Sequence, residues 1–217
     1  RLPGSPRTRR RGRMNRRTSE PPRAWQRMLS GRRLDLLDPS PLDVEISDIA
    51  HGLARVARWN GQTRGDHAFS VAQHSLLVED IMTALDPAIG PDWRLAGLRH
   101  DAPEYVIGDM ISPFKAVVGG GYKAVESRLQ AAIHLRFSLP AERPKTCTTV
   151  IKRADAIAAF WEATRLAGFA EGEAARFFGR PRGLSGDAFA LEPLPAVTVQ
   201  KAFLERFHAI EKQRQAT

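Results

Sequence analysis

The chain has a single cysteine, Cys147, among its 217 residues, so no intrachain disulfide can form. It also lacks any apolar run near the ~18 residues that a membrane-spanning helix needs. No alternating, strand-like run of convincing length and no internal repeat is found. These absences exclude a disulfide scaffold and a membrane-spanning protein, and they argue against a sheet-based fold. One cysteine fits a reducing compartment, and we expect a cytoplasmic protein.

Positive charge is abundant but concentrated at the start of the chain. The net charge is +9, of which residues 1–24 carry +8 through nine arginines and one acid, Glu20. Residues 25–217 therefore carry only +1. A basic chain first suggests a nucleic-acid binder, but here the basic character belongs to the first residues alone.

Residues 1–24 are predicted to form a disordered tail, and residues 25–217 one folded domain. The tail offers almost nothing to bury besides Leu2, Met14 and Ala24, so it cannot offset the entropy cost of becoming ordered. It could be a nucleic-acid arm, a targeting presequence or a start upstream of the true one, but it lacks the apolar core of a secretory signal. A solvated extension is the interpretation we favour over nucleic-acid contact.

The rest of the sequence predicts an all-α fold. Apolar residues recur at helical spacing in segments at about 48–57, 70–81, 92–101, 122–133, 148–166 and 199–210. Ser70 and Gln73 form a capping-box pattern at the start of the second segment. Residues 58–69 and 179–195 are rich in polar residues, Gly or Pro and are expected to be loops.

A His-Asp pair, His100 and Asp101, closes the third predicted helix. Adjacent helical residues point about 100° apart, so two neighbours converge on one ion only from the flank or the last turn of a helix. Such pairs are common by chance. The pair therefore indicates a metal site only in combination with other residues.

Two residues on other predicted helices supply that combination. His74 lies among apolar neighbours, where its ring nitrogens need a partner, and it could be either a hydrogen-bonded core histidine or a ligand. Asp155 lies on or near a buried stripe, where a carboxylate must be paired or bound to a metal. Arg153 and Lys152 are its local alternative partners. Two imidazoles and two carboxylates would suit a divalent ion and leave about two positions open.

The order of these residues resembles that of the HD-domain phosphohydrolase superfamily. The segments SVAQHSLLV, LRHDAPEYVIGD and KRADAIAAF carry the resemblance, which covers about residues 49–167. It is strongest to bacterial HD-domain 5′-deoxynucleotidases and their relatives, which include a phage enzyme that hydrolyses dATP. The resemblance implies a helical bundle, a homodimer and one divalent metal ion (Co, Mn, Zn, Mg or Fe), held by His74, His100, Asp101 and Asp155.

The resemblance also implies two catalytic acids. Glu104 matches the acidic residue that orients or deprotonates the attacking water, and Asp109 matches an acid that contacts the sugar or assists proton transfer. The position of Glu104, four residues after His100 and three after Asp101, places it near the same face if the turn continues. Asp109 follows a glycine and could instead be a turn residue.

Residues that would bind the substrate follow from the same resemblance. Arg58 and Trp59 match an Arg-Trp pair that places phosphate and deoxyribose, and Lys115 matches a lysine near the phosphate. His67 could also reach a phosphate, with less support. Trp59 could instead fill the core, and Arg58 and Lys115 could be solvated charges.

The sequence therefore predicts a metal-dependent phosphohydrolase, favouring a 5′-deoxynucleotidase that converts a deoxynucleoside 5′-monophosphate to nucleoside and phosphate. A dNTP triphosphohydrolase with the same ligands is an alternative, supported by the GQT sequence before the motif helix. A non-catalytic nucleotide- or nucleic-acid-binding protein is an alternative of another class. Superfamily members with two metals use further histidines between the HD pair and the last Asp. Only His134 lies there, so one metal is favoured.

Overall fold

The computed structural model of the chain describes residues 23–118 and 120–216. Nine α-helices and one small two-stranded sheet lie in these residues, so the predicted all-α class is confirmed. The helices are α1 (Ile46–Leu53), α2 (Val71–Leu85), α3 (Pro91–Leu98), α4 (Glu104–Ile107), α5 (Ser112–Val118), α6 (Gly120–Arg136), α7 (Lys145–Arg165), α8 (Glu171–Phe178) and α9 (Ala196–Gln215). Short 3-10 helices are η1 (Pro41–Asp43), η2 (Arg58–Gly61) and η3 (Gly186–Ala188).

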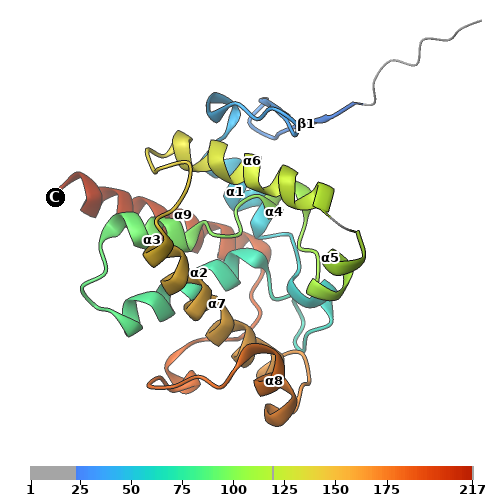
Figure 1. Cartoon of the computed structure of the whole chain (residues 1–217), viewed down its shortest axis with the longest axis vertical. Helices are drawn as coiled ribbons and strands as arrows, with labels where there is room; N and C mark the ends of the chain where they lie inside the picture. Colours follow the sequence, from blue (N-terminus) through green and yellow to red (C-terminus); the bar gives the residue numbers. More distant parts are fainter. Residues whose placement is uncertain (1–22, 119, 217) are drawn as a thin grey trace, which may run out of the picture.

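Helix α2 is the centre of the packing, and it contacts α3, α7 and α9. Helix α1 packs on α4 and α9, and α8 packs on α7. Figure 1 shows the strand β1 over α6 at one end of the molecule and α8 at the other end. None of the helices in the described part of the chain is both long and apolar enough to cross a membrane.

The start of α2 is confirmed as the sequence predicts it. Ser70 is the N-cap residue, and its side chain accepts a hydrogen bond from the backbone N–H of Gln73 at 3.3 Å. The Gln73 side chain does not return to Ser70, as a full capping box requires. It donates to the Glu192 carbonyl (2.8 Å) and accepts from the Leu194 N–H (3.1 Å). The Gln73 amide therefore fastens the loop before α9 onto α2.

The predicted end of the third helix is wrong. Helix α3 ends at Leu98, and Arg99 leaves the helical region at φ −119° and ψ 23°. Pro103 explains the early end, because it has no N–H to donate to the carbonyl of Arg99 four residues earlier. His100 and Asp101 therefore lie in a turn between α3 and α4, where neighbouring side chains can converge more freely than on a helix.

A short hairpin is the second difference, because no strand was predicted. Strands β1 (Trp25–Arg27) and β2 (Arg33–Asp35) pair antiparallel, with Trp25 opposite Asp35. Three residues are too few for an alternating pattern to be recognised. Of the predicted tail, residues 1–22 lie outside the described residues, and the Ala24 carbonyl accepts a hydrogen bond from the Leu36 N–H.

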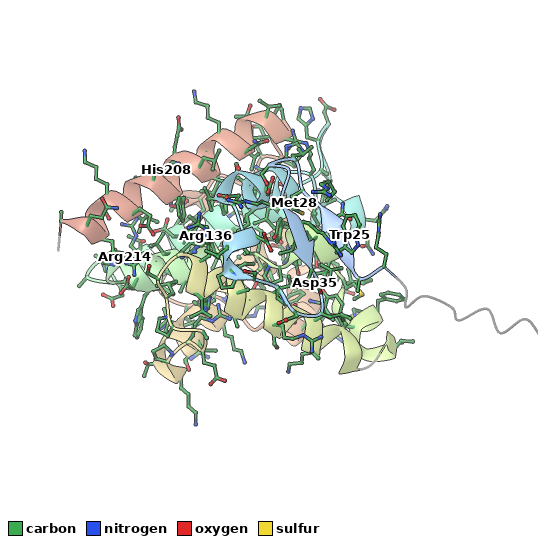
Figure 2. The ribbon with its side chains drawn as sticks, turned by 90° about the horizontal axis from the view of Figure 1, so that it is seen from above. Trp25, Met28, Asp35, Arg136, His208 and Arg214 are labelled. Carbon is green, nitrogen blue, oxygen red and sulfur yellow. The ribbon has the colours of Figure 1, made fainter. Side chains whose placement is uncertain are left out.

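Buried and half-buried charges tie the outer elements to the bundle. Glu79 on α2 is fully buried and binds Arg94 of α3 (2.5 Å) and Arg206 of α9. Near the far end of α9, Arg214 donates to the Phe137 carbonyl just after α6 (2.9 Å). Figure 2 shows Arg214 and the hairpin residue Trp25 towards opposite sides of the molecule. The bundle is therefore fixed at separate places, and the helix that carries His74 is held between α3 and α9.

Helices α1 and α4 approach unusually closely at Gly52. A Cβ atom at this position would lie 2.7 Å from the Tyr105 carbonyl oxygen and 2.8 Å from the Tyr105 Cβ. Such distances do not occur between real side chains, so only glycine fits this contact. The contact sets the distance between α1 and α4, and therefore the position of Glu104, the first residue of α4.

Candidate metal centre

Three of the four residues predicted to bind a metal, His74, His100 and Asp101, form one cluster, and the fourth, Asp155, lies against His74. His74 is fully buried on α2, His100 and Asp101 lie in the turn after α3, and Asp155 is on α7. The His74 Nε2 atom lies 3.3 Å from His100 Nε2, 3.2 Å from Asp155 Oδ1 and 3.6 Å from Asp101 Oδ2. His100 Nε2 is 3.2 Å from Asp101 Oδ2. The alternative pairing of Asp155 with Arg153 or Lys152 is absent from the ion pairs of the described residues.

Hydrogen bonds behind the two rings determine which nitrogen faces the cluster. His74 Nδ1 lies 2.5 Å from a Glu162 carboxylate oxygen, and His100 Nδ1 lies 2.8 Å from the Gly97 carbonyl oxygen. Both partners accept, so both Nδ1 atoms carry a hydrogen. In neutral rings the Nε2 atoms then present lone pairs towards each other and towards two carboxylates. Acceptors that face one another in this way repel unless a metal ion or a proton lies between them.

The donor atoms fit a divalent metal ion. Ligand atoms that bind one ion at ~2.0–2.2 Å lie about 3 Å from their neighbours. The observed separations of 3.2–3.6 Å are slightly wider than this. His74, His100 and Asp101 form a cluster that could hold a metal ion, the only such group found in residues 23–118 and 120–216. The Asp155 carboxylate, which lies against His74, completes the predicted set.

Opposing electrostatic effects act on these groups. Burial and Arg58 lower the pKa of His74, but the carboxylates of Glu162 and Asp155 outweigh them and raise it to about 10. Without a metal, His74 therefore binds a proton, and a metal ion would have to displace that proton to bind the same nitrogen. Burial raises the pKa of Asp101, but the positive charge at His100 and His74 lowers it well below its usual range. The Asp101 carboxylate stays ionised, as a metal ligand must.

Glu162 is a candidate site residue that was not predicted from the sequence. It is fully buried on α7, and one oxygen faces His74 Nδ1. The other oxygen accepts hydrogen bonds from Trp59 Nε1 (2.9 Å) and Arg58 Nε (3.3 Å). Burial raises the pKa of Glu162, but His74 and Arg58 lower it to about 2. The available signal was its spacing, since an acid seven residues after Asp155 shares the same face of a helix.

We expect Glu162→Ala to weaken metal binding about 10–100-fold, the usual effect of removing a carboxylate that orients a ligating histidine. The measurement is the metal Kd by competition with a chelating dye, which needs no substrate. Glu162→Gln keeps one acceptor for His74 and should lose less. Glu173→Ala, at an exposed acid on α8, is the control. An unchanged Kd in Glu162→Ala would reduce Glu162 to a packing role.

Trp59 occupies a strained position beside this carboxylate. Trp59 and Asn60 have φ values of 56° and 52°, in the left-handed region that residues other than glycine rarely adopt. The Trp59 indole is held by Glu162 and packs against Phe169 (5.6 Å between ring centroids) and Phe178 (5.8 Å). Strained backbone is often found at functional sites, so Trp59 is a candidate site residue.

Arg58, Glu104, Asp109 and Lys115 line one cavity of about 700 Å³ beside the cluster. Arg58 pairs with Asp109 (3.2 Å), and Lys115 Nζ lies 3.8 Å from Glu104 Oε1. Glu104 is buried, and its Oε2 has no hydrogen-bond partner among the described residues. Burial and the charges of Asp101 and Asp109 raise the pKa of Glu104 to about 9, against Arg58 and Lys115. A buried carboxyl with such a shift, facing a cavity, is a candidate for proton transfer.

Two predicted or possible site histidines lie elsewhere. His67 is exposed in its loop and is not among the residues that line the cavity, so the structure does not bring it to the site. His134 is buried and makes contacts with Gln130 (2.7 Å) and the Pro140 carbonyl (3.0 Å). Neither residue adds a ligand for a second metal.

No family model matches the chain. Among curated proteins, an uncharacterized protein of Rhodobacter capsulatus is 58% identical to it over 188 residues. This match covers 87% of the chain and 96% of the relative. The relative's description names no activity, so the function has to be argued from the site itself.

Proposed function

This chain belongs to the same family as the Rhodobacter capsulatus protein, and we propose that it is a metal-dependent phosphohydrolase acting on nucleotides. The observation that carries the proposal is the convergence of two imidazole nitrogens and two carboxylates from three segments at the edge of a charged cavity. The resemblance of the motifs to the HD-domain superfamily supports the same reaction class.

In this proposal each charged residue of the cavity has one task. A divalent ion held by His74, His100, Asp101 and Asp155 would neutralise phosphate charge and lower the pKa of a bound water. The positive charge of the ion would lower the raised pKa of Glu104, so that its carboxylate could hold that water and accept its proton. Arg58 and Lys115 would donate hydrogen bonds to the phosphoryl oxygens, and Asp109 would keep the Arg58 guanidinium in place.

The favoured substrate is a deoxynucleoside 5′-monophosphate, which would yield nucleoside and inorganic phosphate. A dNTP triphosphohydrolase would use the same ligands and release triphosphate instead. Both activities would cleave the ester bond between the 5′ oxygen and the α-phosphorus, so the product, phosphate or triphosphate, distinguishes them directly.

The test is a matrix of nucleotides and metals. Deoxynucleoside and ribonucleoside monophosphates and dNTPs would be incubated with the chain and Co²⁺, Mn²⁺, Zn²⁺, Mg²⁺ or Fe²⁺, and phosphate and triphosphate would be measured. We expect metal-dependent release of phosphate from deoxynucleoside monophosphates. An Asp101→Ala preparation controls for contaminating phosphatases. Triphosphate as the main product would favour the alternative, and no turnover under any condition would contradict the proposal.

A non-catalytic nucleic-acid binder is a second candidate because of one surface feature. Three guanidinium groups, those of Arg23, Arg27 and Arg33, lie 4.6–5.5 Å from the centre of the Trp25 ring. Trp25 is half-buried, and aromatic rings flanked by arginines are typical of single-stranded nucleic-acid sites. Salt-dependent binding of an oligonucleotide without nucleotide turnover would favour this function over hydrolysis.

A further inference from the structure

The cavity beside the metal centre has an apolar part that the proposed hydrolysis does not use. Besides the charged residues, its lining includes Phe169, Phe177 and Phe178, together with the side of Trp59. The three phenylalanines come from α8 and the segment just before it, in a part of the chain that carries no recognised motif. They belong to the same cavity as the phosphate-binding residues, so one ligand could contact both.

The four aromatic rings form a connected wall. Trp59 lies 5.6 Å from Phe169 and 5.8 Å from Phe178, and Phe177 lies 6.5 Å from Phe169 and 6.2 Å from Phe178. The rings meet at angles of 54–87°, so none of these pairs is stacked face to face. In tilted and edge-to-face pairs one ring covers at most one face of the other, so ring faces of the wall remain on which a flat ligand ring can stack.

Phe177 is the most exposed member of the wall, at 68% of its surface. Helix α8 packs on α7, the helix of Asp155 and Glu162. It ends at Phe178, and Gly179, with φ 76°, is its C-cap residue. A large aromatic side chain left in solvent at the lining of a cavity is a common mark of a binding site. Exposure of this apolar ring to water is unfavourable, and a ligand that covers the ring would remove that cost.

We propose that Phe177, with Phe169 and Phe178, forms a subsite for the planar aromatic part of the substrate, a nucleobase. The inference rests on the proposed function, since it places the phosphate of the same molecule among Arg58 and Lys115. It adds a specificity: the wall discriminates between the presence and absence of a base, and hardly between one base and another.

The tolerance towards different bases follows from the chemistry of the wall. Phenylalanine rings offer no hydrogen-bonding group, and the Trp59 N–H is already engaged by Glu162. The remaining uncharged lining residues, Met110, Ile111, Pro113, Ala156 and Ala159, are also apolar. A base edge thus finds no side-chain donor or acceptor among these uncharged residues, whereas its face can stack on the wall.

The experiment compares kcat/KM for deoxynucleoside 5′-monophosphates with kcat/KM for 2-deoxyribose 5-phosphate, which has no base. In the wild type the nucleotides should be favoured about 10–100-fold, as expected for stacking of one base, with little difference among the four bases. Phe177→Ala should lower this ratio about tenfold, and Phe177→Tyr should restore it. Phe114→Ala is the matched control, since Phe114 is also exposed (53%) but does not line the cavity.

A second measurement separates this inference from the hydrolysis itself. Calorimetry with deoxyadenosine, which carries no phosphate, reports binding to the wall without any reaction. If neither phosphate ester is hydrolysed, the proposed function fails, but a deoxyadenosine Kd weakened about tenfold by Phe177→Ala still supports the subsite. A wild-type ratio near one, or equal deoxyadenosine binding in wild type and Phe177→Ala, would overturn the subsite.

Discussion

Replacing Glu104 by alanine is expected to lower kcat for nucleotide hydrolysis by about 10²–10⁴-fold, the usual contribution of a general base. The carboxyl is buried in the cavity wall, and Oε2 has no other partner among the described residues. Its loss removes the group that would take a proton from the attacking water. The metal content and the nucleotide Kd should stay near those of the wild type, because Glu104 belongs to neither set of ligands.

Glu126 offers a matched control for this result. Its carboxylate also lies 3.8 Å from Lys115 Nζ, but Glu126 does not line the cavity. Glu126→Ala therefore perturbs the same lysine without removing the proposed base, and should change kcat little. Steady-state kinetics together with metal analysis by mass spectrometry test both variants. Loss of metal from Glu104→Ala would reassign Glu104 as a ligand, and unchanged kcat would remove it from the mechanism.

The second large effect is expected for Asp155→Asn, which should greatly weaken metal binding and abolish activity. Asp155 Oδ1 faces His74 Nε2 at 3.2 Å, on the side of the ring where the metal is proposed. The protein without metal should remain folded, because asparagine has nearly the same shape and the side chain is 42% exposed. If Asp155 instead stabilised the fold through a pair with Arg153 or Lys152, this change would lower stability equally with and without metal.

Thermal unfolding with and without divalent ion separates these outcomes. A metal present at a hundred times its Kd stabilises the folded protein by ~2.7 kcal/mol, which raises Tm of a chain of this size by roughly 5–10 °C. The wild type should show this shift and Asp155→Asn should not. Asp109→Asn, a carboxylate of the same cavity that pairs with Arg58, should keep the shift. Equal shifts in wild type and Asp155→Asn would mean that Asp155 is not a ligand.

Local patterns in the sequence were sufficient to predict the helices that carry the ligands. The start of α2 is determined by Ser70, and apolar spacing marks α2 and α7, which pack together and bring His74 near Asp155. Such patterns depend only on neighbours along the chain, so they can be recognised without a structure. The turn that holds His100 and Asp101 was missed because Pro103 prevents the helix from continuing. How many residues before a proline a helix ends depends on context.

Residues that act through distant contacts could not be predicted in the same way. Glu162 gains its role only because α7 lies against α2 and against Trp59, which is 103 residues earlier in the sequence. Helix α8 was not predicted, and Phe177 is only one of two adjacent phenylalanines in a short segment until α8 folds onto α7. The hairpin strands were too short to leave a pattern. For Glu162 and Phe177 the missing information is the packing of α7 and α8 against their neighbours.

The contact at Gly52 has a consequence for how inactive variants would be interpreted. Any side chain at residue 52 must push α4 away from α1, because a Cβ atom would meet the backbone of Tyr105. Glu104 would move with α4, while His74 on α2 and Asp155 on α7 would keep their places. Asp101, whose carbonyl accepts a hydrogen bond from the Glu104 N–H, would be the proposed ligand most affected. Under the proposed function such a protein would be inactive although most ligands of its metal are in place. A screen for catalytic residues would then select a position that lies outside the cavity and touches no substrate, because that position acts as a spacer.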